Sequence, residues 1–222
     1  MAQEDFKTNQ IEVTGMVLKQ QPMGENDKRV VILTRERGKI SGFAHGARRP
    51  NSPLLASTDT FCYGTFRLIE GKNSFSILEA SIDNYFSFFR THVNEAMLGQ
   101  YFCEICDYAA QENNDESQLL LLLYQSLRAL MIEDYPKKLV RTVFEIRSVV
   151  IEGEFRPVDP LKVRPSTKKA VDYIMTSDIA HLYSFAVDEP TLRELTDLAR
   201  RRLSECFEHR FRSAEVLDVL GI

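Results

Sequence analysis

The chain has 222 residues and a mass of 25.5 kDa, enough for one large domain or two small ones with a buried core. Hydrophobic residues make up 44% and charged residues 27%, the proportions of an ordinary globular protein, which excludes wholesale disorder. No apolar run reaches the ~18 to 20 residues that cross a bilayer, and the net charge of −4 excludes a globally basic nucleic-acid binder.

The N-terminal segment MAQEDFKTNQ is acidic and polar, which is not the composition of a signal peptide. Four cysteines without a secretory signal indicate free thiols in a reducing compartment. We therefore expect a cytoplasmic protein.

The first part of the chain, residues 1–83, is predicted to form a small antiparallel β-domain. Its strand-like segments are rich in β-branched and aromatic residues, are separated by Gly, Asn and Pro, and lie at 12–21, 28–36, 39–45, 60–71 and 74–82. Five strands over about 80 residues favour an OB-fold barrel, with an SH3-like barrel as the alternative.

From residue 84 onward the hydrophobic period becomes helical, which predicts an all-α domain over 84–222 and an α+β protein as a whole. Helices are expected at 93–111, 116–133, 137–152 and 188–211, and a short one from an N-cap at Ser166 through Met175. The helix at 137–152 carries one apolar stripe, with polar residues elsewhere around it; the stripe consists of Leu139, Val143, Ile146 and Val150, and the polar set of Lys137, Arg141, Glu145 and Ser148.

Charge is unevenly distributed along the chain. Residues 15–72 contain ten Lys or Arg against five Asp or Glu, whereas residues 85–222 contain 17 against 22. This asymmetry suggests that the N-terminal part binds an anion and that the C-terminal part has another role.

The third predicted strand, KISGFAH, alternates in character. Ile40, Gly42 and Ala44 suit a barrel interior, while the outward set is Lys39, Ser41, Phe43 and His45. An aromatic ring between cations is typical of single-stranded nucleic acid binding, because bases stack on the ring while the cations hold phosphates. The alternative is that Phe43 packs under a loop or against the helical domain.

Two adjacent arginines, Arg48 and Arg49, follow this strand in a loop held by Gly46 and Pro50. Such a loop can present backbone and guanidinium groups to one ligand. The alternative is an ordinary solvated surface, since acids such as Glu25, Asp27 and Glu36 are scattered nearby.

The cysteines and histidines do not form a recognisable active site. Cys103 and Cys106 form a C-x-x-C pair inside a predicted helix, and neither Cys62 nor Cys206 has a Cys or His at zinc-knuckle spacing. We expect packing rather than a metal site. The four histidines are isolated and there is no glycine-rich phosphate loop, so we predict no catalytic residues and no cofactor.

Four segments resemble the RecO family of recombinational repair mediators. They are VLKQQPMGENDKRVVILTRERGKISGFAHGARRPNSPL at 17–54, FSILEASIDNYF at 75–86, LVRTVFEIRSVVIEGEFRP at 139–157 and FRSAEVLDVL at 211–220. The resemblance implies an OB-fold followed by a helical bundle. It also implies a protein that binds single- and double-stranded DNA, anneals complementary strands and, with RecR, helps RecA replace SSB on single-stranded DNA. A nucleoid-associated location follows from that role.

The resemblance extends to the binding residues. Its basic positions fall on Lys28, Arg29, Arg35, Arg37, Lys39, Arg48 and Arg49, to which the strand pattern adds Phe43. His45 stands where many family members carry a basic residue. Relatives often have a zinc ribbon after the segment that here reads GEFRP, but this chain has no cysteine between 107 and 205. The zinc ribbon is therefore expected to be absent, with a metal-free connector at about 154–166.

SSB proteins end in an acidic, hydrophobic tail, and a groove between helices flanked by Arg or Lys would suit it. We expect that groove in the helical part. Two other functions stay open: a protein-interaction adaptor whose barrel is only a scaffold, and an enzyme using Cys103 or Cys106 as a thiol.

Overall fold

The computed structural model describes residues 9–72, 74–159 and 161–220, with the side chain of residue 220 left out. It divides into two compact units. One holds the described residues up to Phe86 together with Ala110–Leu120, and the other holds Ser87–Ala109 together with the described residues from Leu121 onward. Most of the N-terminal segment that we expect not to be a signal peptide, residues 1–8, lies outside the described part.

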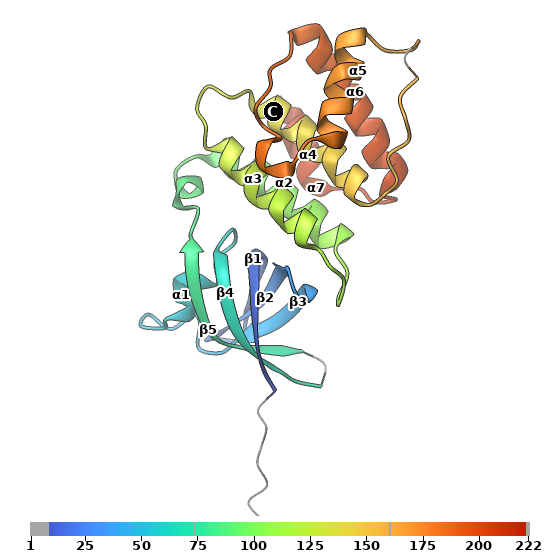
Figure 1. Cartoon of the computed structure of the whole chain (residues 1–222). Helices are drawn as coiled ribbons and strands as arrows, with labels where there is room; N and C mark the ends of the chain where they lie inside the picture. Colours follow the sequence, from blue (N-terminus) through green and yellow to red (C-terminus); the bar gives the residue numbers. More distant parts are fainter. Residues whose placement is uncertain (1–8, 73, 160, 221–222) are drawn as a thin grey trace, which may run out of the picture. The chain divides into compact units, whose positions relative to one another are not determined.

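The first unit is a closed barrel (Figure 1). Its strands follow the spatial order β1-β2-β3-β5-β4, with bounds β1 Gln10–Met23, β2 Asp27–Thr34, β3 Gly38–Ala44, β4 Tyr63–Glu70 and β5 Phe75–Asn84. All neighbours are antiparallel except β3 and β5, which pair in parallel through Gly42 with Phe75 and Phe43 with Ser76. The prediction of a five-stranded OB-fold barrel is confirmed.

The barrel interior is built from alternate residues of its strands. The core includes Val13, Val17, Val30, Ile32, Ile40, Ala44, Phe66, Leu68 and Ile77. Along β3 buried and half-buried residues alternate, as the sequence pattern predicts. Gly42 lies where β5 closes the barrel, and a Cβ atom there would come within 3.2 Å of the Phe75 carbonyl oxygen. A glycine at this position therefore lets the two strands approach.

The second unit is helical. The elements after the barrel strands are η1 Ser87–Arg90, α2 Val93–Ala109, α3 Ser117–Leu130, α4 Lys137–Ile151, α5 Pro165–Thr176, η2 Ile179–His181, α6 Glu189–Cys206 and α7 Arg212–Leu220; a one-turn helix, α1 Leu54–Ser57, belongs to the barrel unit. The predicted helices are present within a few residues of their expected ends, except that the last one ends at Cys206. Sequence reasoning missed α1, α7 and the short 3-10 turns.

The starts of α5 and α6 can be compared with the predicted ones: the first differs and the second agrees. Helix α5 begins at Pro165 with Arg164 as the N-cap, so Ser166 lies inside the helix, where its hydroxyl shares a 2.8 Å hydrogen bond with that of Thr191. Helix α6 does begin with an acidic N-cap, since Asp188 accepts a hydrogen bond from the Thr191 N–H at 2.9 Å.

Among the residues described, none of the helices has the length and apolar character needed to cross a bilayer.

Helix α4 departs from the expected single stripe. Every residue from Leu139 to Val149 is buried, including Arg141 and Glu145, which lie off the apolar stripe. Helices α2, α5 and α6 all contact α4, so no side of this stretch is left to solvent. Burying charged groups in this way requires that they pair with one another.

Candidate nucleic-acid interface

A groove of about 510 Å³ lies beside β3 and is lined by Arg29 of β2, by residues of β3, by the connection between β4 and β5, and by residues 112–113. Arg29 and Phe43 are direct cross-strand neighbours there, and both side chains line the groove. The Arg29 Nε–H donates to the Ser41 hydroxyl at 3.0 Å, which holds the guanidinium against the outer face of β3. A cation and an aromatic ring are therefore placed side by side on the face that OB-folds use for oligonucleotides.

The walls of the groove carry charges of both signs. Arg37 donates to Glu70 at 3.2 Å and to the Asn113 side-chain carbonyl at 3.4 Å. Lys72, in the loop between β4 and β5, is exposed and forms no ion pair with any described residue. Arg29 and Lys72 therefore remain available to an anionic ligand, whereas Arg37 is already neutralised.

The remaining wall comes from a segment distant in sequence. The Lys39 N–H donates to the Gln111 carbonyl at 3.0 Å, and the Asn113 N–H donates to the Arg37 carbonyl at 2.9 Å. These bonds place Glu112 and Asn113 at the groove. Sequence reasoning missed both residues, because nothing local at 110–113 shows that this segment pairs with β3.

The loop after β3 is held by Asp27. Its carboxylate accepts from the Gly46 N–H at 2.8 Å and contacts His45 Nδ1 at 2.9 Å. The Gly46 hydrogen bond, reinforced by His45, lowers the pKa of Asp27 below its ordinary value. Gly46 has a φ of +68°, a conformation that favours glycine. These contacts fix the start of the loop that carries Arg48 and Arg49.

The two arginines of that loop differ in role. Arg48 donates its backbone N–H to Asn26 and its guanidinium to the Gly24 carbonyl, both at 2.8 Å, so it ties the loop to the β1–β2 turn. Arg49 is exposed, and its guanidinium forms no hydrogen bond or ion pair within the part of the chain that is described. Arg49 is therefore the freer of the two cations.

The other predicted binding residues are dispersed. Lys28 is buried, with its ammonium donating to the Leu55 carbonyl at 2.8 Å and to Asp59 at 2.9 Å, so it fastens β2 to α1 and the following turn. Arg35 is paired with Glu36 at 3.0 Å in the β2–β3 turn. That turn and the arginine loop lie at opposite ends of β3, about 23 Å apart for seven residues.

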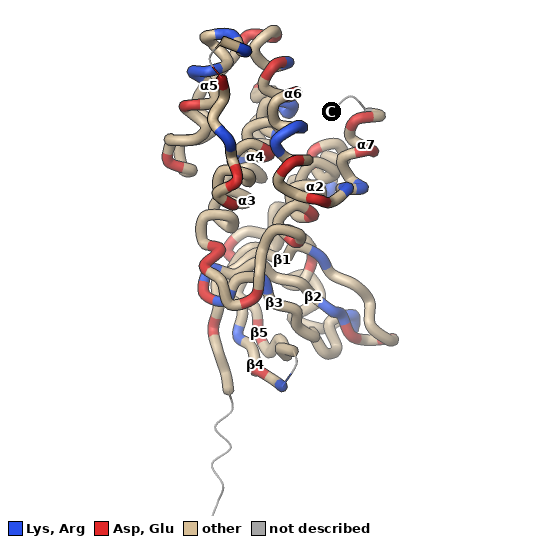
Figure 2. Tube along the Cα trace, turned by 90° about the vertical axis from the view of Figure 1, so that its right-hand side faces the viewer, with Lys and Arg blue, Asp and Glu red and all other residues tan. Residues whose placement is uncertain are grey.

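Cations and acids are interleaved along the trace of the barrel (Figure 2). The structure thus brings Arg29, Arg37 and Phe43 together in the groove and places Arg48 and Arg49 at one end of the same strand. It does not gather all the predicted cations into one cluster.

The cysteines lie in the helical core. Cys103 and Cys106 are buried in α2, as expected for cysteines that pack in a core. Burial, with Asp107 nearby, raises the pKa of Cys103 far above its ordinary value, so this thiol stays protonated. No group of His, Cys, Asp and Glu within the described residues has the geometry of a metal site.

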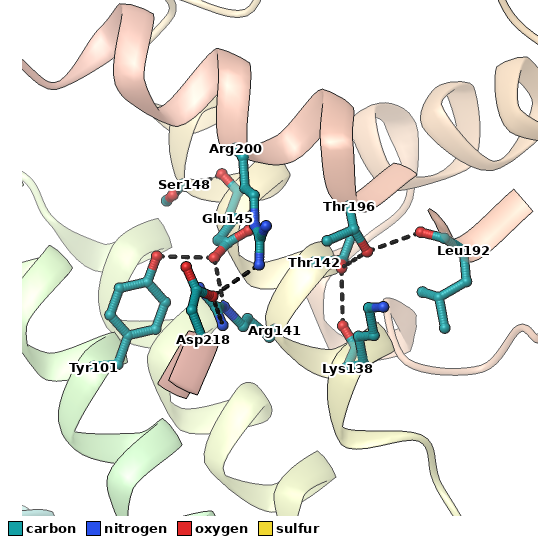
Figure 3. A network of polar contacts seen from close by, with 10 residues as sticks. All are labelled: Tyr101, Lys138, Arg141, Thr142, Glu145, Ser148, Leu192, Thr196, Arg200 and Asp218. Atoms are coloured by element: carbon teal, nitrogen blue, oxygen red, sulfur yellow. Dashed lines mark hydrogen bonds and ion pairs between the residues drawn. The ribbon is translucent and has the colours of Figure 1, made fainter. Parts of the chain in front are cut away.

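A second pocket, of about 270 Å³, lies in the helical unit next to a buried polar network (Figure 3). Glu145 accepts from the Tyr101 hydroxyl at 2.8 Å and from Arg141 Nε at 2.9 Å, both on its Oε1 atom. Arg141 and Arg200 each donate to the Asp218 carboxylate, at 3.0 and 2.8 Å. Leu203 and Phe211 add apolar surface to the pocket. An arginine pair beside apolar side chains suits a carboxylate-bearing peptide.

Family models match residues of both units. The family described as "Recombination protein O N terminal" matches residues 8–86, and the one described as "Recombination protein O C terminal" matches residues 90–154. The DNA repair protein RecO of Acetivibrio thermocellus is 28% identical over 246 residues, covering 96% of this chain and 98% of that protein.

Two Clostridium relatives with the same description match over shorter stretches. The protein of Clostridium novyi is 30% identical over 148 residues, which cover 67% of this chain and 56% of the relative. That of Clostridium acetobutylicum is 37% identical over 105 residues, which cover 47% and 42%. In these two alignments the chain spans about half of the relative's length. The family matches and the full-length relative agree, and the chain belongs to the RecO family of DNA repair proteins.

Proposed function

We propose that this protein is a DNA-binding recombination mediator that holds single- and double-stranded DNA on the β2–β3 face of its barrel. The observation that supports this most directly is the groove in which Arg29, Phe43 and Lys72 meet. OB-folds bind oligonucleotides on the faces of strands 2 and 3 with the β1–β2 and β4–β5 loops at either side, and these residues occupy that position.

The geometry suggests how a single strand would lie. Arg29 and Lys72 bind phosphates, Phe43 stacks on a base, and Arg49 binds the backbone beyond the end of β3. The length of β3, about 23 Å, accommodates a few nucleotides of extended strand, consistent with the ~4 or more nucleotides that one OB-fold holds. Arg48 contributes by fixing the loop that carries Arg49. Lys28 has a structural role in this arrangement.

Annealing of complementary strands requires neither bond cleavage nor a cofactor. A strand whose phosphates are partly neutralised by bound cations repels an incoming complement less strongly. Pairing can then begin while the backbone is still held. We therefore propose a non-catalytic protein.

A mediator also needs surfaces for proteins. We propose that it works with RecR to load RecA onto DNA coated with SSB, and that the SSB tail binds the helical unit. The pocket beside Arg141 and Arg200 has the chemistry for that tail, since acidic residues can pair with the guanidinium groups and apolar ones can contact Leu203 and Phe211.

The DNA-binding proposal is tested by titrating a fluorescent single-stranded oligonucleotide at several salt concentrations. Arg29→Ala should weaken binding and reduce the slope of log K against log salt by about 0.7, the value for one phosphate contact to a single strand. Arg67→Ala is the matched control, because this substitution removes the same charge from a barrel strand. Arg67 pairs with Glu79 and does not line the groove.

The proposal is rejected if Arg29→Ala and Arg67→Ala bind the oligonucleotide equally well. An adaptor with a scaffold barrel would show little binding of the wild-type protein at any salt concentration.

A further inference from the structure

Helix α7, Arg212–Leu220, packs against α2 in the helical unit. At its start, the Glu104 carboxylate accepts the N–H groups of Arg212 and Ser213, each at 3.1 Å. In its last turn Leu217 is fully buried and Asp218 meets the two arginines. The helix has nine residues, whereas isolated helices shorter than ~12 to 15 residues are marginal in water. Its order therefore depends on docking.

The arginine pair is already in place for an acidic ligand. Arg141 is buried and oriented by Glu145, and its guanidinium lies 5.1 Å from the centre of the Tyr101 ring. Arg200 is half-exposed and forms an ion pair with Asp218. Both guanidinium groups donate to the same oxygen, Asp218 Oδ1 (Figure 3). One carboxylate thus occupies two cationic groups.

The sequence of α7 has the chemistry of the ligand proposed for this pocket. It reads RSAEVLDVL, in which acids alternate with apolar residues. Glu215 lines the pocket with Asp218 and is paired with Arg210, while Leu217 supplies the buried apolar contact. Val216 and Val219 are exposed. An acidic, apolar segment of the chain therefore engages both arginines through Asp218 and forms one wall of the pocket.

We propose that α7 is a cis-acting occupant of the acidic-tail site, and that an acidic, apolar C-terminal peptide binds by displacing it. Asp218 takes the place of a carboxylate of the incoming peptide on Arg141 and Arg200. The apparent affinity for the peptide is then reduced by the fraction of molecules in which α7 is docked. This inference rests on the proposed binding of the SSB tail to the helical unit, and adds how that site is regulated.

The test uses the full chain and a fluorescent synthetic peptide with three aspartates, then apolar residues and a free carboxylate. Asp218→Asn should bind it about 5- to 10-fold more tightly than the wild type, the factor expected when the two ion pairs of the half-exposed Asp218 no longer hold α7. Leu217→Ala, which weakens docking and leaves both arginines intact, should also bind more tightly. Asp172→Asn is the matched control, since Asp172 pairs with Lys168 on α5.

Amide hydrogen exchange provides the second measurement. Saturating peptide should speed exchange of the α7 amides in the wild type and leave α4 protected. Equal peptide affinity in the wild type, Asp218→Asn and Leu217→Ala would overturn the inference, as would α7 amides that stay protected in the peptide complex.

The outcomes separate this inference from the functions proposed above. If the peptide binds all variants equally and Arg200→Ala abolishes binding, the tail site stands and displacement of α7 is wrong. If the peptide binds none of them, both the tail site and the inference are wrong. Oligonucleotide binding by the barrel is measured separately, and its affinity should be the same in Asp218→Asn and the wild type.

Discussion

Replacing Arg141 by Met tests the buried charge network of the helical unit. The Glu145 side chain is 1% exposed and that of Arg141 is 6% exposed, so the substitution leaves a carboxylate in the core with the Tyr101 hydroxyl as its remaining hydrogen-bond donor. The second carboxylate oxygen, Oε2, already has no hydrogen-bond partner among the described residues. Breaking a buried pair of this kind costs about 3–5 kcal/mol. At about 2–4 °C per kcal/mol for a chain of this length, the melting temperature should fall by about 6–20 °C.

The loss of stability caused by Arg141→Met should increase with pH. Burial raises the pKa of Glu145, and Arg141 opposes that rise, so the pKa of Glu145 rises further in Arg141→Met. A carboxyl whose pKa is higher in the folded than in the unfolded chain stabilises the fold below its unfolded pKa, and this contribution is lost as pH rises through the folded pKa. The destabilisation of Arg141→Met should therefore be largest at about pH 8 and smaller at about pH 5.

The assay is thermal unfolding followed by far-ultraviolet circular dichroism, which reports on the helices. Adding Glu145→Leu to Arg141→Met removes the unpaired charge and should recover much of the lost stability. Tyr101→Phe in the same background should recover more, because the orphaned hydroxyl would otherwise cost about 1–3 kcal/mol. A loss of less than 1 kcal/mol in Arg141→Met, or one that is the same at both pH values, would refute the reasoning.

Two further predictions concern the barrel. Phe43→Leu should weaken single-stranded DNA binding by the ~1–3 kcal/mol of one stacked base, about 5- to 150-fold, measured by fluorescence anisotropy. Its melting temperature should be unchanged because Phe43 is only half-buried; unchanged affinity would mean that no base stacks there. Gly64→Ala should lower the urea midpoint by about 1 M, because its Cβ would lie 2.1 Å from the Ser81 carbonyl oxygen. A midpoint equal to that of the wild type would show that β4 and β5 can separate without cost.

The architecture was largely predictable because its signals are local. Period-two alternation in residues 39–45 correctly identifies Ile40 and Ala44 as core residues and Phe43 as an outward one. The change to a helical period after residue 84 correctly predicts the helical unit. Helix α7 was missed because nine residues are fewer than the ~11 or more over which a helical period is recognised.

The candidate site was predictable only in part. That cations and an aromatic ring line the outer face of β3 follows from the order of residues along the strand. Which cations are available depends on distant partners: Asp59 and Leu55 bury the ammonium of Lys28, and the Gly24 carbonyl engages Arg48. The groove wall at Asn113 likewise comes from far along the chain.

The amino-acid sequence by itself determined the barrel, the helical part, the basic character of the β2–β3 region and the family to which the chain belongs. Each of these follows from short-range patterns of apolar, small and charged residues. Only the tertiary structure decided which charges stay available to a ligand, which are consumed in ion pairs, and that Arg141 and Glu145 are buried together. The physical reason is that desolvation and pairing depend on neighbours in space, and those neighbours lie from four to more than seventy residues apart along the chain.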